Sequence, residues 1–264
     1  MELVNAPQIG IVVPTLGTRS DFLNQALISI RAAGECHIVI VAPEPENIIK
    51  SYSEKLFDSV IADPKKGLSQ AINVGMRSMP TSIKYVNWLG DDDLLTPDCL
   101  TVTSRILENS PKTVCVYGQC SYIGPDGKTL WVNKSGAYAK WLMRVGPQLI
   151  PQPGSLFTLK AFNEVGGLNT TYKWAFDLDL FLKFARVGEF RYIPQVLSSF
   201  RWHVGSLSVG GRLGSVTEAS KIRRTYLPRS IQFISPLWEF VIRRIILVAG
   251  VVLSKKSGNN QEKK

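Results

Sequence analysis

The chain has 264 residues, of which 45% are hydrophobic and 20% are charged. This composition supplies a packed core, so it excludes a disordered chain, a collagen-like repeat and a small disulfide scaffold. The four cysteines show no CxxC or Cys/His metal spacing, so we expect ordinary core thiols in a reducing compartment. They are Cys36, Cys99, Cys115 and Cys120.

The net charge is +10, and most of it lies near one end of the sequence. Residues 215–264 hold ten Lys and Arg against three acidic residues, which accounts for +7. A nucleic-acid binder usually carries its positive charge on the folded face that grips phosphate, so we expect no nucleic-acid partner. The first residues lack a basic region, and the apolar run at 9–13 is too short for a signal peptide. These features predict a cytoplasmic protein.

Strands and helices alternate along the first half of the sequence. Apolar, β-branched runs predict buried parallel strands over 9–13, 37–42, 59–62 and 84–89. Apolar residues at helical spacing predict helices over 22–33 and from 67 to about 79. Thr96 is expected to cap a further helix that runs to about Asn109. The alternation predicts an α/β fold wound in βαβ units, with a ligand crevice at the carboxyl ends of the strands.

The second half has a different pattern. Strand-like segments at 114–122 and 129–132 flank a turn at 125–127, which predicts a hairpin. Helices are expected over 157–166 and 178–185, and a strand over 190–200. A stretch rich in glycine and serine at 205–215 is expected to mark the end of the folded domain. The predicted organisation is a domain at 1–210 followed by a basic extension at 211–264.

Three adjacent carboxylates follow the strand expected at 84–89. Asp91, Asp92 and Asp93 have a simple interpretation as turn and capping residues. However, Thr96 is already expected to cap the next helix, and three adjacent carboxylates repel one another unless a cation lies among them. Mg²⁺ and Mn²⁺ favour one or two carboxylates together with substrate phosphates. This pattern therefore indicates a site for a metal and a nucleotide.

Other polar residues allow two interpretations each. Asp177 begins a helical pattern, where it either caps the helix or acts as a general base. His203 follows a strand and is either structural or a ligand. Lys66 and Gly67 precede a helix, where cations and backbone N–H groups bind phosphate or a lysine simply lies in solvent.

Several ordered motifs together resemble the family 2 glycosyltransferases of the GT-A fold, which have a Rossmann-like, mainly parallel sheet flanked by helices. The resemblance covers about residues 8–208. Its motifs are VVPT at 12–15, KGLSQAIN at 66–73, WLGDDDLLTP at 88–97, IPQPGS at 150–155, VGGL at 165–168, FDLDLFLK at 176–183 and FRWH at 200–203.

The resemblance implies transfer of a sugar from a nucleotide donor to a hydroxyl group, with inversion at the anomeric carbon. It implies that Asp177 is the catalytic base and that Asp92 holds Mn²⁺ or Mg²⁺, with His203 as a second metal ligand. The donor-binding residues that it implies are Pro14, Thr15, Arg19, Asp63, Lys66, Gly67, Asp91, Asp92 and Asp93. Candidates for the acceptor side are Gln152, Trp174 and Asp179, of which Trp174 has an equally simple interpretation as a core residue.

The sequence departs from the family pattern at two places. Ala42 stands where relatives commonly carry an Asp that contacts the base, and Gly90 replaces the first acid of the usual DxDD arrangement. These changes leave the base open, with uridine or thymidine favoured. The departures do not affect the residue expected to hold the metal.

The segment 236–253 is mostly apolar but contains charged residues. Glu239, Arg243, Gly250 and Ser254 fall near one helical face, with most apolar residues away from it. An amphipathic helix with basic flanks suits peripheral binding to an anionic membrane, at the inner face of the cell membrane. The alternative is a helix packed on the body or against a partner in a homodimer. A disordered tail is expected to follow.

The predicted function is assembly of a bacterial surface polysaccharide on a glycan or lipid-linked acceptor. A sugar-phosphate nucleotidyltransferase is an alternative, although the segment after the first strand lacks a loop rich in glycine and basic residues. A non-catalytic carbohydrate-binding or membrane scaffold protein is another, against which the intact acidic residues argue.

Overall fold

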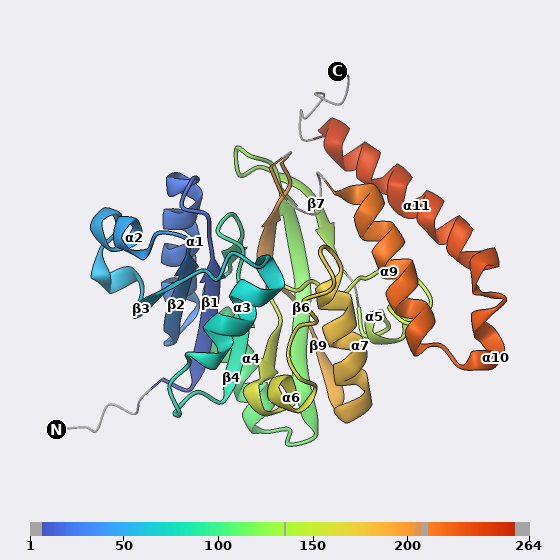
Figure 1. The fold of residues 1–264 in the computed structure, drawn as a ribbon, viewed down its shortest axis with the longest axis horizontal. Coiled ribbons are helices and arrows are strands. Elements are labelled where there is room, and N and C mark those ends of the chain that lie inside the picture. The colour runs from blue at the N-terminus through green and yellow to red at the C-terminus, as the bar shows by residue number, and fades with distance from the viewer. Residues whose placement is uncertain (1–6, 135, 204, 207–210, 257–264) are drawn as a thin grey trace.

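The computed structural model describes residues 7–134, 136–203, 205–206 and 211–256. The described chain forms one nine-stranded sheet with helices on both faces, as Figure 1 shows. The order is β3-β2-β1-β4-β8-β6-β9-β5, with β7 beside β6. The strands are β1 (Ile9–Pro14), β2 (His37–Ala42), β3 (Ser59–Ala62), β4 (Tyr85–Trp88), β5 (Leu94–Leu95), β6 (Thr113–Ile123), β7 (Thr129–Asn133), β8 (Leu156–Thr158) and β9 (Glu189–Arg201).

The helices lie between and after these strands. They are α1 (Ser20–Ala33), α2 (Pro45–Ser51), the 3-10 helix η1 (Glu54–Leu56), α3 (Leu68–Arg77), α4 (Cys99–Glu108), α5 (Ala139–Leu142), α6 (Leu159–Glu164), α7 (Phe176–Val187), α9 (Arg212–Tyr226), α10 (Arg229–Gln232) and α11 (Ser235–Lys256).

The first half of the sheet is parallel, as predicted. β1 pairs in parallel with β2 and β4, and β2 with β3. Successive side chains of a strand point to opposite faces, so both faces of β1 are covered. Ile11 and Val13 pack against α1 and α4, whereas Val12 packs against α3 and the second half of the molecule. The carboxyl ends of these strands therefore meet at one edge.

The second half of the sheet is mixed rather than mainly parallel. β6 pairs in parallel with β9 but antiparallel with β7 and β8, and β8 pairs antiparallel with β4. The hairpin at 113–133 is present as predicted. The helix expected over 157–166 begins later, because Leu156–Thr158 completes the sheet as β8 and α6 starts at Leu159.

The predicted cap at Thr96 is wrong. The hydroxyl of Thr96 donates to the carbonyl of Val196 at 3.0 Å, which fixes the end of β5 beside β9. Helix α4 begins at Cys99, and Asp98 before it has a left-handed backbone with φ +59°. Tertiary pairing with β9 therefore sets this boundary.

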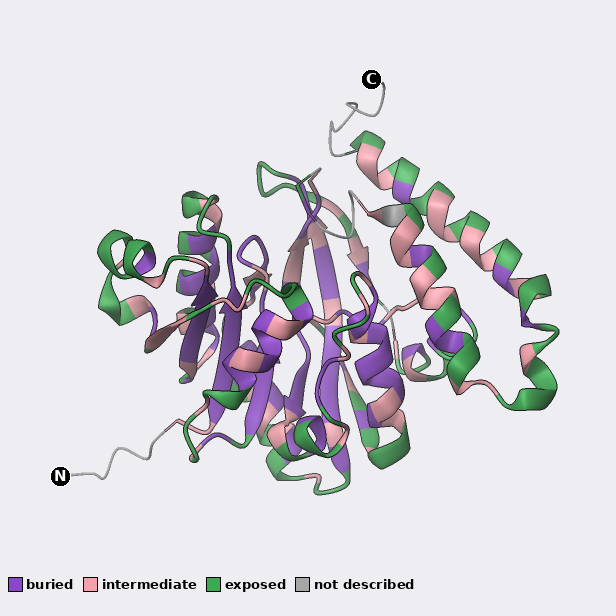
Figure 2. Cartoon of the chain, viewed as in Figure 1, coloured by how far each residue is buried: buried purple, intermediate pink, exposed green. Residues whose placement is uncertain are grey.

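The C-terminal helices pack on the rest of the molecule. α9 lies against α7, and α11 runs along the outer side of α9 (Figures 1 and 2). The expected helix at about 236–253 lies within α11. All four cysteines are buried and unpaired, as predicted, and burial raises the pKa of their thiols.

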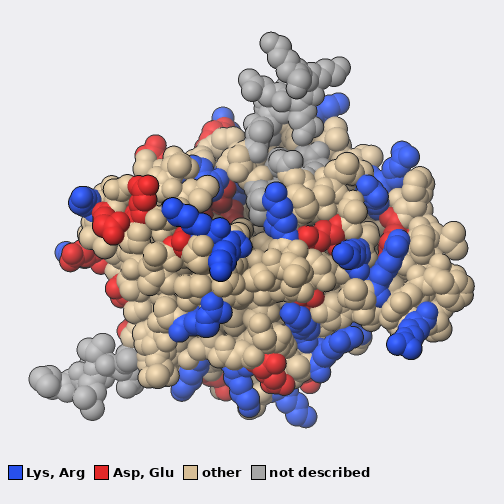
Figure 3. Space-filling view, in the orientation of Figure 1, with Lys and Arg blue, Asp and Glu red and all other residues tan. Residues whose placement is uncertain are grey.

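Basic side chains are spread over the face that Figure 3 shows, including the surface of the C-terminal helices. No described helix is long and apolar enough to cross a membrane. The first five residues and the expected disordered tail at 257–264 lie outside the described residues.

Candidate active site

Two adjoining cavities lie at the carboxyl edge of the parallel strands. The first, of about 520 Å³, includes Thr15, Asp63 and Gly67 in its lining. The second, of about 300 Å³, includes Asp92, Asp93 and Asp177. The two cavities are neighbours, because four residues line both of them: Pro14, Arg19, Leu68 and Asp91.

The acidic residues lie on a tight turn directly after β4. The N–H of Asp93 donates to the carbonyl of Gly90 at 3.1 Å and closes the turn. A Cβ atom added to Gly90 would lie 2.9 Å from an oxygen of Asp92. A side chain at Gly90 would therefore require the carboxylate of Asp92 to shift from its position over the turn.

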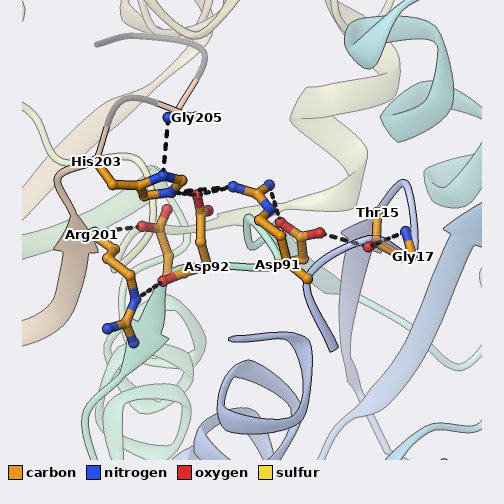
Figure 4. A network of polar contacts seen from close by, with 9 residues as sticks. Thr15, Gly17, Asp91, Asp92, Arg201, His203 and Gly205 are labelled. Atoms are coloured by element: carbon orange, nitrogen blue, oxygen red, sulfur yellow. Dashed lines mark hydrogen bonds and ion pairs between the residues drawn. The ribbon is translucent and has the colours of Figure 1, made fainter. Parts of the chain in front are cut away.

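Asp91 contacts the loop after β1. The hydroxyl of Thr15 donates to Asp91 Oδ2 at 2.6 Å, and the guanidinium of Arg19 pairs with Asp91 Oδ1. Burial raises the pKa of Asp91, and the hydrogen bond from Thr15 and the charge of Arg19 only partly oppose the rise. Thr15, Arg19 and Asp91 thus come together, and Figure 4 shows Thr15 beside Asp91. Arg19 and Asp91 line both cavities.

Asp92 is the carboxylate with the strongest cationic and hydrogen-bonding partners. Its Oδ2 lies 2.7 Å from Nη1 of Arg19 and 2.7 Å from Nε2 of His203 (Figure 4). Burial would raise its pKa, but the hydrogen bond from His203 and the charge of Arg19 outweigh this, so the pKa of Asp92 is lowered. The N–H of Gly205 donates to Nδ1 of His203 at 3.1 Å, which places the ring proton of neutral His203 on Nε2, toward Asp92.

Asp93 is buried and binds the backbone of a distant strand, which suits a structural role. It is 5% exposed, and its Oδ1 accepts the backbone N–H of Arg201 at 3.0 Å. Burial and the charge of Asp92 raise the pKa of Asp93 well above its ordinary value. The side chain of Arg201 donates from Nε to the carbonyl of Asp92 at 2.9 Å and is itself buried. Arg201 lies inside the FRWH motif, but no local sequence pattern indicates this role.

Asp92 and His203 are the candidates to hold a divalent cation. Oδ2 of Asp92 and Nε2 of His203 are in direct hydrogen-bond contact at 2.7 Å, and Nη1 of Arg19 lies at the same distance from this oxygen. Within the described residues, no group of three or more His, Cys, Asp and Glu is arranged to hold a metal. Two protein donors with phosphate and water as the remaining ligands suit Mg²⁺ or Mn²⁺. Metal binding through Nε2 of His203 requires its proton to leave that atom.

Asp177 also lines the second cavity and lies at the start of α7. Its Oδ1 accepts the N–H of Leu178 at 2.8 Å. Burial raises the pKa of Asp177 to about 6, against the smaller opposing effect of this hydrogen bond. A carboxyl group with that pKa is ionised at neutral pH and still accepts a proton readily.

The acceptor-side candidates separate in the structure. Gln152 and Trp174 line the second cavity, and the amide of Gln152 donates to the carbonyl of Trp88 at 2.7 Å. Asp179 is not among the lining residues; it is buried, pairs with Lys183 at 2.9 Å and accepts the hydroxyl of Tyr226 at 2.7 Å.

The donor-side candidates also differ in position. Pro14, Asp63 and Gly67 line the first cavity, and Gly67 begins α3 with φ +93°, which favours glycine. Lys66 is exposed and outside that lining, where its neighbour Lys65 lies instead.

Comparison with known proteins gives the following relatives. No family model matches the chain. An uncharacterized glycosyltransferase of Rickettsia prowazekii is 26% identical over 215 residues, which cover 76% of this chain and 65% of the relative. The chondroitin synthase of Pasteurella multocida is 24% identical over 169 residues, covering 62% of this chain and 17% of the synthase. The chain thus spans less than two thirds of the length of these relatives.

Solved structures share the fold. The mannosyltransferase PcManGT from Pyrobaculum calidifontis, in complex with GDP-Man and Mn²⁺, has a TM-score of 0.67 at 13% identity, covering 98% of this chain and 77% of the mannosyltransferase. S. aureus TarS 1-349 has a TM-score of 0.61 at 13% identity, covering 97% of this chain and 75% of TarS. This likeness shows that the chain has the fold of this mannosyltransferase and of TarS, and its sequence relatives are named as a glycosyltransferase and a chondroitin synthase.

Proposed function

We propose that the protein is a metal-dependent, inverting glycosyltransferase that uses a nucleoside diphosphate sugar and a glycan or lipid-linked acceptor. The observation that carries the proposal is the pair of adjoining cavities at the carboxyl edge of the sheet. One cavity has the size and position for a nucleoside, and the other is lined by Asp177 and by Asp92, whose carboxylate contacts His203.

The donor binds across the junction of the two cavities. Thr15 and Asp63 border the nucleoside, and Arg19 lies between that cavity and Asp92, where a diphosphate carries its charge. Asp92 and His203 would hold Mn²⁺ or Mg²⁺, which would neutralise charge on the departing diphosphate. PcManGT is in complex with GDP-Man, so guanosine joins uridine and thymidine as a candidate nucleoside of the donor.

Asp177 accepts the proton of the attacking hydroxyl group. The acceptor oxygen forms a bond to the anomeric carbon while the bond from that carbon to the diphosphate oxygen breaks. The proton passes to Asp177 and the nucleoside diphosphate leaves. Attack from the side opposite the leaving group inverts the anomeric centre, and holding both reactants in line contributes much of the rate. Trp174 and Gln152, which line the same cavity as Asp177, border the acceptor.

The experiment that tests this function is hydrolysis and transfer with a panel of UDP-, dTDP- and GDP-sugars in Mn²⁺. We expect one donor to be consumed, with release of the nucleoside diphosphate. Release of pyrophosphate from a sugar phosphate and a nucleoside triphosphate would favour a nucleotidyltransferase instead. No nucleotide binding at all would favour a scaffold protein.

Asp92→Asn tests the metal assignment by calorimetry. We expect Mn²⁺-dependent binding of the nucleoside diphosphate to weaken at least tenfold, with little change in the thermal midpoint. Asp126→Asn is the matched control, because Asp126 lies on the exposed turn of the β6–β7 hairpin and pairs with Lys128. Unchanged affinity in the Asp92 variant contradicts the assignment.

The outer face of α11 supports membrane attachment. Large apolar side chains on this face are exposed, among them Leu237 at 77%, Ile245 at 60% and Val248 at 62%. Patches of this kind usually mark interaction sites. The basic residues Arg244, Lys255 and Lys256 are exposed on the same helix, whereas its one acidic residue, Glu239, is buried against Arg224.

The polar side of α11 faces the body. Glu239 pairs with Arg224 of α9 at 2.6 Å, and Ser254 accepts the indole N–H of Trp202 at 3.2 Å. This arrangement directs the apolar side outward, opposite to a helix that buries its apolar side in a core. Apolar burial with basic flanks suits the anionic face of a lipid bilayer, and a second copy of the chain is the alternative occupant.

A further inference from the structure

Helix α9 holds the segment that leads into the catalytic helix α7. The carboxylate of Glu218 accepts three successive backbone N–H groups: those of Lys173 at 2.9 Å, Trp174 at 2.7 Å and Ala175 at 2.8 Å. Ala175 directly precedes α7, and its methyl side chain cannot form a capping hydrogen bond. Glu218 thus gives from another helix the anionic support that a capping residue usually gives locally.

A second contact holds the same segment. A Cβ atom added to Gly214 of α9 would lie 2.8 Å from ring atoms of Trp174, so the indole lies directly on the backbone of α9. Trp174 also lines the second cavity. The segment 173–175 therefore contacts α9 through its backbone and through the indole of Trp174, which also lines the cavity.

Asp177 follows this segment by two residues. Asp177 lines the cavity and lies in the first turn of α7. The position of its side chain therefore depends on the backbone path by which the chain enters this helix. The negative charge of Glu218 also adds to the rise in the pKa of Asp177 that burial causes. Glu218 is therefore linked to Asp177 by backbone position and by charge.

We propose that Glu218 is a positioning residue, which fixes the backbone of residues 173–175 and thereby sets the place of Asp177 and Trp174 on the acceptor side of the cavity. The inference rests on the proposed function of Asp177. It makes α9 part of the catalytic unit, although α9 lies beyond residue 210. A displacement of about 1 Å from productive geometry can cost about 10²-fold in rate.

The test compares Glu218→Gln and Glu218→Ala with Tyr226→Phe in the full chain. Tyr226→Phe is the matched control, because it removes another hydrogen bond between α9 and α7, to Asp179, without touching residues 173–175. For the Glu218 variants we expect kcat to fall roughly 10- to 100-fold with the KM for the donor nearly unchanged. The acid limb of the pH–rate profile should move to lower pH, because a negative charge near Asp177 is removed. The control should keep the wild-type kcat and acid limb.

Hydrogen exchange supplies a readout that does not depend on turnover. In Glu218→Gln the amides of residues 173–175 should exchange faster than in the wild type, while those of β1 should not change. Unchanged exchange, normal kcat, or equal losses in Tyr226→Phe would each overturn the positioning role. The two proposals fail in different ways. If the wild-type protein transfers no sugar, the proposed function is overturned. If the wild type is active and Glu218→Gln is equally active, only the positioning role is overturned.

Discussion

Asp91, Asp92 and Asp93 are adjacent in the chain, yet each carboxylate has its own partners. Asp91 binds Thr15 and Arg19, Asp92 binds Arg19 and His203, and Asp93 accepts a backbone N–H from the far strand β9. The pKa is lowered for Asp92 and raised for its two neighbours. The residue with the lowered pKa is the one that remains anionic most readily, which is what a metal ligand needs.

The pH dependence of turnover follows from Asp177. Burial raises its pKa to about 6, and only the ionised carboxylate accepts a proton. We expect kcat to rise with pH and to reach half of its plateau near pH 6. A profile measured between pH 4.5 and 8 checks this. An acid limb near pH 4 would contradict the assigned environment of Asp177.

Replacing Asp177 with Asn should reduce kcat by about 10²–10⁴-fold and leave donor affinity intact, because a general base is lost and the donor contacts remain. Steady-state turnover and calorimetry of the nucleotide measure the two effects separately. Near-normal turnover would move the role of base to another group.

The same substitution should stabilise the fold at neutral pH. The folded-state pKa of about 6 lies above the unfolded value of 3.8, so burial of the Asp177 carboxylate costs stability as the pH rises from about 4 to 6, and the full cost remains above pH 6. We expect Asp177→Asn to raise the free energy of unfolding by about 1–3 kcal/mol at pH 8. The gain should disappear near pH 3, where both states hold the proton. Denaturant unfolding at the two pH values tests the sign.

At the scale of elements, the contact of α3 with the parallel strands places the donor cavity. Gly67 and Leu68 at the start of α3 line that cavity, so the helix must approach the sheet closely. A Cβ atom at Gly75 would lie 2.5 Å from Val12 and 3.0 Å from Val41, both buried. Glycine at this position therefore sets the distance between helix and sheet.

Gly75→Ala should destabilise the protein. The better helix propensity of alanine contributes about 1 kcal/mol, but overpacking against two buried valines costs about 1–3 kcal/mol. We expect a net loss in the free energy of unfolding and a lower thermal midpoint. Arg77→Ala on the exposed side of α3 is the control and should change stability little. An increase in stability would show that α3 shifts freely on the sheet.

At the scale of the whole molecule, the outer face of α11 is exposed on the C-terminal side of the fold. Ile245→Glu introduces a charge into this face without touching the contacts of α11 with α9. We expect binding to vesicles of phosphatidylcholine and phosphatidylglycerol to fall at least tenfold, with an unchanged thermal midpoint. Raised salt should weaken wild-type binding only in part, because apolar burial persists when charges are screened.

A matched control is available on α1. Ile28 is 50% exposed, and Ile28→Glu should leave vesicle binding unchanged. A wild-type protein that does not sediment with vesicles but forms a dimer that Ile245→Glu breaks would assign the face to a second copy of the chain.

The sequence by itself determined the first half of the fold and the place of the acidic residues. Parallel strands buried on both faces are continuous apolar runs, which is why β1, β2, β3 and β4 were predictable. Asp63 and Asp91 were expected at one edge because parallel strands end on the same side. The FDLDLFLK motif marked Asp177, and its side chain does line the cavity with the acidic turn.

Tertiary structure alone decided which groups meet. Arg201 lies 108 residues from Asp93, and Glu218 lies 43 to 45 residues after the amides that it binds, so no local pattern reveals either pair. Thr96 fits a helix cap by sequence, but pairing of β5 with β9 takes its hydroxyl. Asp179 turns away from the cavity because residues two apart on a helix do not share a face. Periodicity revealed the two sides of α11, but only packing against α9 decided that its polar side faces inward, since the buried Glu239 needs the charge of Arg224.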